Sequence, residues 1–250
     1  VLALLGALLL GACGGDDDDG ASPAVPGASA TGTASAQAAY PVKVKDLLGR
    51  EVEIKAKPQT VVGLSPTAVE FVYSVGGTVA GRASSAEYPA AAMQAKAVGT
   101  AYQPSFEEIL ALKPDLIVAD SIIQAGQQYR PRLEGLGVPV IFAGADSYQK
   151  VVDGVTLMGK VFDAEGKARE VIAGIEKARN DAKAAVAANK ASAVFLIAGR
   201  DNVLYGAKDS SYAGDVLKQA GITNPAASQP DAGPFPGYTT LATEKLLEYN

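Results

Sequence analysis

Hydrophobic and polar positions follow two kinds of period in the first part of the chain. Residues 40–54 (YPVKVKDLLGREVEI) alternate, which predicts two strands joined by a turn at residues 48–50. An apolar run at residues 61–64 predicts a buried strand, and the Ser-Pro pair after it supplies a helix N-cap and a proline at the first helical position. Two glycines at residues 76–77 end this helix, and residues 79–81 begin the next strand. The order strand–helix–strand is typical of a parallel sheet.

The same order of elements recurs further along the chain. Ser105 and Glu108 have the spacing of a capping box at the start of a helix. The run LIVA at residues 116–119 predicts a fully buried strand, and VPVIFAG at residues 138–144 predicts another. Residues 40–149 are therefore expected to form an N-terminal α/β lobe.

A long helical region comes next. Val151, Val155 and Met158 form one apolar stripe, and a second stripe continues along residues 164–187 at the spacing of an amphipathic helix. At about 1.5 Å per residue the second helix would be about 36 Å long, enough to cross a domain. Residues 150–188 are therefore expected to form linking helices.

Strand and helix patterns resume after the linking helices. SAVFLIAGRDNVLYG restarts the strand pattern, and SSYAGDVLKQAG predicts a helix with a serine cap and a glycine stop. Residues 189–250 are expected to form a C-terminal α/β lobe. Its last predicted helix, in TTLATEKLLEYN, has no strand after it, so we expect this lobe to be truncated. The predicted fold class is α/β, with two lobes of mainly parallel sheet joined by a single long helix.

The composition excludes several classes of function. The 250 residues carry 22 Lys and Arg against 27 Asp and Glu, and this net charge of -5 argues against nucleic-acid binding. One cysteine excludes an internal disulfide framework and a cysteine-rich zinc site. The absence of histidine removes the commonest metal ligand and general base, and with it Ser-His-Asp and Cys-His catalysis. We assign no catalytic residue, no metal ligand and no resident cofactor.

The N-terminal 39 residues differ from the rest. Residues 1–12 are an apolar run, too short for a membrane-spanning helix but of the length of a signal-peptide core. The sequence LGAC that ends at Cys13 resembles a bacterial lipobox, which predicts acylation of Cys13; the alternative is a buried cysteine in a hydrophobic segment. Residues 14–39 lack apolar periodicity, which favours a flexible tether. The run of four aspartates in it reads as a solvated spacer rather than a calcium site.

Several stretches in order carry a resemblance to a known family. They are VVGLSPTAVEFVYSVGG, SSAEYP, AVGTAYQPSFEEILALKPDLIVAD and the long helix. Over residues 42–250 the sequence resembles the substrate-binding lipoproteins of ABC importers for iron complexes (siderophore or haem) and cobalamin. The resemblance implies two lobes joined by one long helix, with the ligand in a cleft between them. It also implies a non-enzymatic, monomeric protein that is anchored to a lipid bilayer outside the cytoplasm and delivers its ligand to a permease and its ATPase.

The resemblance further implies one acidic residue in each lobe that contacts the permease. By motif position these are Glu107, before ILALKPD, and Glu244, before LLEYN. An alternative for Glu107 is a first-turn carboxylate that is favourable to the helix dipole, and the two roles can coexist.

The ligand is expected beyond the carboxyl ends of the strands, because open α/β sheets bind ligands there. Tyrosine stacks on planar ligands or binds ferric iron as phenolate, and arginine pairs with anionic oxygens. The predicted ligand-binding residues of these two types are Arg82, Tyr88, Tyr102, Arg200, Tyr205 and Tyr238.

A ferric siderophore or related iron complex fits this set of residues, and haem or cobalamin is the alternative within the same type of protein. The lack of tryptophan leaves no indole to stack on a corrin. An alternative of another class is a surface-anchored α/β enzyme without histidine or cysteine chemistry.

Overall fold

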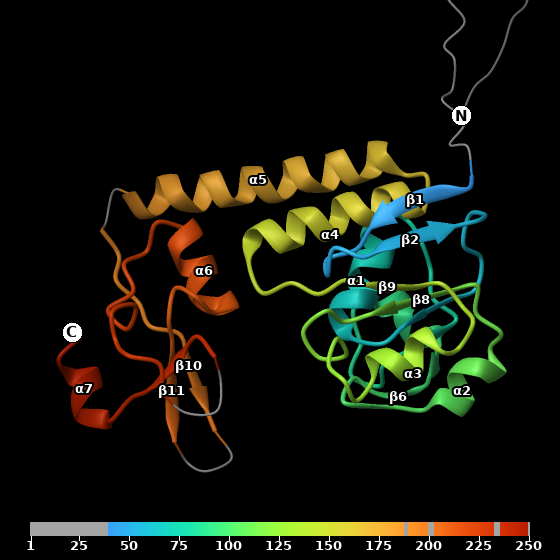
Figure 1. The fold of residues 1–250 in the computed structure, drawn as a ribbon. Coiled ribbons are helices and arrows are strands. Elements are labelled where there is room, and N and C mark those ends of the chain that lie inside the picture. Colours follow the sequence, from blue (N-terminus) through green and yellow to red (C-terminus); the bar gives the residue numbers. More distant parts are fainter. Residues whose placement is uncertain (1–39, 188–189, 200–202, 233–235, 250) are drawn as a thin grey trace, which may run out of the picture. The chain divides into compact units, whose positions relative to one another are not determined.

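The computed structural model describes residues 40–187, 190–199, 203–232 and 236–249 of the chain. All of them belong to one compact unit, residues 38–250 (Figure 1). The predictions of a signal remnant, an acylated Cys13 and a tether fall on residues outside this description, as does the prediction for Arg200.

The chain enters the fold through the predicted hairpin. Strands β1 (Val42–Lys45) and β2 (Glu51–Ile54) pair antiparallel. The buried carboxylate of Asp46 holds the turn, because it accepts hydrogen bonds from the backbone N–H of Leu48 and Arg50. It also accepts from the N–H of Phe142, which fastens the hairpin to the main sheet.

The main sheet has five strands in the order β5-β4-β3-β8-β9, and every neighbouring pair is parallel. This confirms the predicted parallel sheet. In chain order the strands are β3 (Val61–Gly63), β4 (Gly81–Arg82), β5 (Lys96–Ala97), β8 (Leu116–Ala119) and β9 (Val140–Phe142).

Short helices and one small hairpin connect these strands. Helix α1 (Pro66–Ser74) starts where predicted, with the Ser65 hydroxyl accepting from the N–H of Ala68. Helix α2 (Phe106–Ala111) is capped in the same way by Ser105. The second hydrogen bond of a capping box, from the N–H of Ser105 to the Glu108 carboxylate, is not formed. The carboxylate of Glu108 pairs with Lys96 instead, and the N–H of Ser105 donates to the carbonyl of Val98. The other elements are η1 (Ala90–Gln94), β6 (Gly99–Thr100), β7 (Gln103–Pro104) and α3 (Arg130–Glu134).

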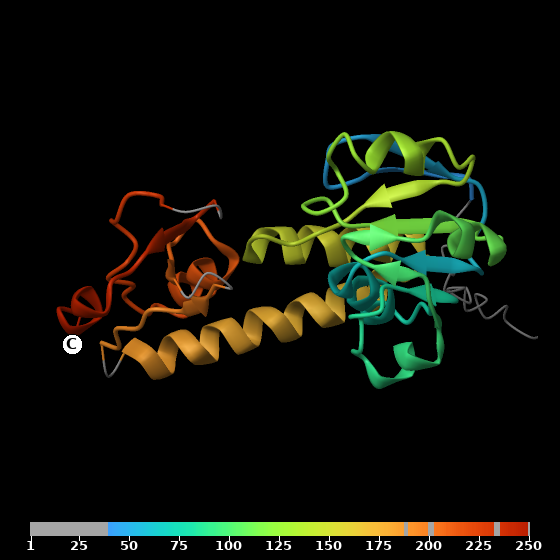
Figure 2. The same ribbon diagram turned by 90° about the horizontal axis from the view of Figure 1, so that it is seen from below.

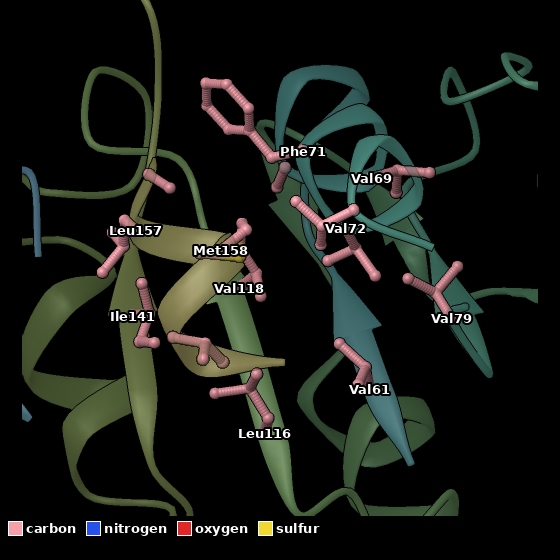
Figure 3. Packing of buried hydrophobic residues seen from close by; sticks show 14 of the residues in the cluster. Val61, Val69, Phe71, Val72, Val79, Leu116, Val118, Ile141, Leu157 and Met158 are labelled. Atoms are coloured by element: carbon pink, nitrogen blue, oxygen red, sulfur yellow. The ribbon is translucent and has the colours of Figure 1, made fainter. Parts of the chain in front are cut away.

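Both faces of the main sheet are buried, which explains why its strands read as continuous apolar runs. Val61, Val118 and Ile141 point toward Val72 of α1 and Met158 of the later helix (Figure 3). The alternate positions of the same strands form a second cluster on the other face, together with side chains that include Ile109 and Leu133. The sheet is thereby held rigidly between two layers.

Two helices follow the sheet and lie side by side: α4 (Tyr148–Val161) and α5 (Glu165–Ala187) (Figures 1 and 2). The 23 residues of α5 confirm the predicted long helix. Ala168 near its start is buried, and Val171 and Ile172 pack against the core. The rest of the helix leads away from that core to the C-terminal lobe.

The C-terminal part contains β10 (Leu196–Ala198), β11 (Leu204–Ala207) and β12 (Tyr238–Thr240), with α6 (Tyr212–Gln219) and α7 (Thr243–Leu247). The two-lobed α/β prediction expected mainly parallel strands, but these three strands pair antiparallel. The connection between β10 and β11 has only five residues, which is too short for a parallel crossover. The predicted parallel pairing is therefore right for the main sheet of the N-terminal lobe and wrong for these three C-terminal strands.

Candidate functional site

A hollow of about 670 Å³ opens beside the main sheet, between α1, α4, α5 and the start of α6. Aromatic and aliphatic side chains dominate its wall. The lining residues are Thr67, Glu70, Phe71, Tyr73, Ser74, Tyr88, Pro89, Ala145, Val151, Val155, Val171, Ile175 and Tyr212.

Helix α1 supplies five of these residues because of where it begins. Its cap at Ser65 comes directly after β3, so its first turn lies at the carboxyl end of the sheet. Thr67, Glu70 and Ser74 recur at spacings of three and four and therefore share one face of the helix. That face is turned to the hollow. The sheet thus places Thr67, in the first turn of α1, at the edge where an open α/β sheet binds its ligand, and Glu70 and Ser74 follow along the same helix face.

The long helices supply the apolar part of the wall. Val151 and Val155 come from α4, and Val171 and Ile175 from α5. Each pair is spaced by four residues and so faces one direction. Phe71 completes this surface and is only 5% exposed, because its ring is wedged between α1 and α4.

Three tyrosines frame the hollow. Tyr73 is partly buried, whereas Tyr88 is 70% exposed and Tyr212 is 49% exposed. Tyr88 follows the carboxyl end of β4, and Tyr212 is the first residue of α6 in the C-terminal lobe. Phenol rings at an exposed rim offer flat faces to a ligand and keep their hydroxyls in water.

The electrostatic character of the lining is set by Glu70. It is the one charged residue among the described lining residues, which include no lysine and no arginine. Its carboxylate has no hydrogen bond or ion pair within the described part of the chain. Glu70 is an exposed residue, and partial desolvation of its carboxyl raises its pKa from the ordinary value of a glutamate. The hollow is therefore an apolar, aromatic space with a single unpaired negative charge.

The C-terminal lobe contacts the start of α4 close to this hollow. Asp215 on α6 accepts a hydrogen bond of 2.6 Å from the backbone N–H of Tyr148, the first residue of α4. An aspartate at a helix N-terminus also complements the helix dipole. The guanidinium of Arg179 on α5 lies 4.7 Å from the centre of the Tyr148 ring. Helices α4, α5 and α6 are thus tied together beside Tyr212.

Of the predicted ligand residues, Tyr88 lines the hollow and Arg82 does not. Arg82 is only 8% exposed, and its Nη1 donates to the carbonyl oxygens of Ala83 (3.1 Å) and Ser84 (2.8 Å). Its Nε is buried without a partner among the described residues. In this structure the guanidinium holds the backbone that follows β4.

The remaining predicted tyrosines lie away from the hollow. Tyr102 is 70% exposed in the β6–β7 turn, where its carbonyl accepts a hydrogen bond from the hydroxyl of Tyr129. Tyr205 is buried within β11, and Tyr238 opens β12 opposite Ala207. Their predicted contact with ligand stays a prediction.

A buried glutamine that was not among the predicted ligand residues organises the carboxyl edge of the sheet. The Nε2 of Gln124 donates to the carbonyls of Leu64 (2.9 Å) and Ala101 (2.7 Å), and its Oε1 accepts from the N–H of Asp120 (2.5 Å). Three loops that converge only in the fold are joined by one side chain, so local sequence patterns carry no signal for it. For Glu70, by contrast, the sequence carries a signal, because its spacing from Thr67 and Ser74 puts it on the polar face of α1.

The two predicted permease-contacting residues are both exposed, and each lies in the first turn of a short helix. Glu107 belongs to α2 and Glu244 to α7. Their neighbours Glu108 and Glu248 pair with Lys96 and Lys245, whereas Glu107 and Glu244 make no ion pair with any residue that the structure describes.

The described residues include neither a metal-binding cluster nor a membrane-spanning helix. No three or more His, Cys, Asp or Glu side chains gather there in a way that would hold a metal ion. No helix within the described ranges has the length and apolar character needed to cross a membrane.

Comparison with known proteins adds a family match. A model of the family described as "Periplasmic binding protein" matches residues 61–250, which is most of the chain. The crystal structure of the periplasmic catecholate-siderophore binding protein VctP from Vibrio cholerae superposes with a TM-score of 0.69. It has 21% identity and covers 84% of this chain and 75% of that one. This likeness confirms the predicted two-lobed α/β fold.

Two relatives are named for different ligands. The Fe(3+)-citrate-binding protein YfmC of Bacillus subtilis is 25% identical over 182 residues, 70% of this chain and 57% of the relative. The vitamin B12-binding protein of Salmonella choleraesuis is 35% identical over 107 residues, 43% of this chain and 40% of the relative. The chain thus spans about half the length of these relatives.

Proposed function

Because the chain belongs to the periplasmic binding protein family, we propose that it is the substrate-binding component of an ABC importer that captures a ferric siderophore or a related iron complex. The observation that carries this proposal is the aromatic hollow of about 670 Å³ beside the carboxyl end of the sheet. Sites for small ligands have volumes of about 300–1,000 Å³ and mostly apolar walls with a few polar groups. The hollow has that size and that wall.

The iron-complex ligand class draws support from two directions. Relatives are named for ferric citrate and for vitamin B12, both of them metal complexes. The chain itself contains no tryptophan to stack on a corrin, and three tyrosines frame the hollow. Haem and cobalamin remain the alternatives for the same site.

The protein is proposed to bind its ligand without chemical change and to pass it to the permease. The exposed, unpaired carboxylates of Glu107 and Glu244 are the proposed contacts with that permease, whose ATPase drives the transport. Cys13 is proposed to hold the protein, as a monomer, on a membrane outside the cytoplasm. A signal core and a lipobox in front of a low-complexity tether support this anchoring.

The test is a titration of the purified protein with ferric hydroxamates, ferric catecholates, ferric citrate, haemin and cobalamin, followed by tyrosine fluorescence and thermal unfolding. A true ligand present at about 100 times its Kd adds about 2.7 kcal/mol to the free energy of unfolding. We expect one iron complex to stabilise the protein and to be recovered unchanged afterwards. Stabilisation by none of these compounds, or conversion of one of them, would contradict the proposed function.

A further inference from the structure

We infer that the hollow selects a ferric complex that carries a cationic group, such as a pendant ammonium, and that Glu70 supplies the counter-charge. This inference rests on the proposed function and narrows it to one charge class. It departs from an arginine-based recognition of anionic complexes, which the residues of the sequence had suggested.

The wall of the hollow carries a single charged side chain among the described residues. Glu70 is the only ionised side chain that the described residues bring to the hollow. Arg82 is not in the wall, and its guanidinium is held by the carbonyls of Ala83 and Ser84. An anionic complex would therefore meet one like charge and no opposite charge among the described lining residues. A cationic complex would meet a carboxylate whose hydrogen-bonding capacity is unused.

A ligand that binds in the hollow would remove water from the carboxylate of Glu70. Glu70 is exposed in the free protein, so its carboxylate keeps much of its water, although partial desolvation already raises its pKa. A ligand seated against Phe71 and Val155 would displace the remaining water from this side of α1. A carboxylate that loses its water needs a cation or a hydrogen-bond donor in exchange. Charge-assisted pairing with an ammonium group supplies both.

The three tyrosines of the hollow also favour a cationic ligand. Tyr73, Tyr88 and Tyr212 line the same hollow as Glu70 and come from α1, from the loop after β4 and from α6. The face of a phenol ring attracts a cation through its quadrupole. The carboxylate of Glu70 and the faces of the tyrosine rings would therefore both attract a cationic group of the ligand.

The experiment compares two ligands that differ in one charge. Ferrioxamine B is a ferric trihydroxamate with a free ammonium group, and its N-acetyl derivative is the same complex without that charge. We expect the wild-type protein to bind the ammonium form about tenfold more tightly, the scale of one charge-assisted hydrogen bond. Glu70→Gln should remove this preference, whereas the control Glu53→Gln, at an exposed position of β2, should keep it.

Ferric enterobactin, an anionic tricatecholate complex, and ferric citrate complete the panel and separate the two proposals. Tighter binding of either anionic complex than of ferrioxamine B would overturn the charge assignment and leave the proposed function standing. Equal affinity for the two trihydroxamates, or a preference that survives in Glu70→Gln, would overturn it as well. If Glu70→Gln folds poorly, the comparison of ferrioxamine B with its N-acetyl derivative on the wild-type protein still tests the charge assignment. Binding of no complex at all would overturn both proposals.

Discussion

The ring of Phe71 on α1 lies against the backbone of Gly154 on α4. A methyl group added at Gly154 would lie 2.6 Å from both Cε atoms of that ring, closer than side chains approach one another in proteins. The missing side chain therefore lets the two helices come together with the ring between them. Since Phe71 also lines the hollow, this contact joins the packing of the core to the shape of the candidate site.

Gly154→Ala is expected to force the Phe71 ring away from α4 and to lower the free energy of unfolding by about 1–3 kcal/mol, the usual cost of overpacking a core. Gly174→Ala on α5 is the matched control, because a methyl group there meets nothing within 4 Å. That control should be neutral or stabilising by up to about 1 kcal/mol, since alanine favours a helix over glycine. Urea unfolding measures both. Equal stability of Gly154→Ala and wild type would mean that the ring has room to move.

Gln124→Met is expected to destabilise the carboxyl edge of the sheet. The thioether keeps the volume but leaves the carbonyls of Leu64 and Ala101 and the N–H of Asp120 without their partner. Each buried group left unpaired costs about 1–3 kcal/mol. Gln127→Met, at an exposed position, should change stability by less than about 0.5 kcal/mol. A melting temperature of Gln124→Met like that of Gln127→Met would show that water replaces the lost hydrogen bonds.

The local patterns of the sequence predicted the N-terminal lobe well because each element there carries its own start and stop signals. Ser65 and Ser105 cap their helices as expected, and the apolar runs became strands buried on both faces. The antiparallel pairing of β10, β11 and β12 was missed, since periodicity does not give strand direction. A short connection turns β11 back beside β10, whereas β12 joins β11 only after a long connection that contains α6.

The candidate site was predictable only in part. Tyr88 was singled out because it follows the carboxyl end of a strand, and it lines the hollow, while its contact with a ligand stays a prediction. Arg82 occupies a similar place in the sequence, yet its side chain turns to nearby carbonyls, which no pattern of residue types reveals. Val171 and Ile175 line the hollow because α5 passes the lobe on that side, and such packing of distant helices is decided by the whole fold.

Glu70→Gln is expected to raise the melting temperature at neutral pH. Partial burial raises the pKa of Glu70, so the folded protein binds this proton more tightly than the unfolded chain does, and stability falls as pH rises through the raised pKa. Glu70 is the only carboxyl group among the described residues that line the hollow. The gain in Glu70→Gln should vanish in acid, below the ordinary pKa of a glutamate. A gain that is the same at both pH values would have to come from another cause than this ionisation.

Cys13→Ser is expected to abolish lipidation and to release the protein from the membrane fraction. Cys13 closes a short apolar run and is the only thiol of the chain, so no other cysteine replaces it. The measurement is incorporation of labelled palmitate in cells that express the full-length protein, with Ser29→Ala in the predicted tether as a control that keeps the label. Equal labelling of Cys13→Ser and wild type would refute the anchor.

Reversal of both Glu107 and Glu244 to lysine is expected to stop uptake while ligand affinity stays within about twofold of wild type. Neither residue lines the hollow, and both carboxylates are exposed and free of ion pairs with described residues, so they are open to a basic partner surface. Reversing one charge of a close interfacial pair turns attraction into repulsion, which costs several kcal/mol. Glu108→Lys on α2 with Glu248→Lys at the C-terminal cap of α7 is the matched control, since those carboxylates pair within the protein. Transport is measured with a labelled iron complex in cells, and affinity by titration of the purified variants. A parallel loss of ligand binding, or an equal loss of uptake in the control, would place the permease contact elsewhere.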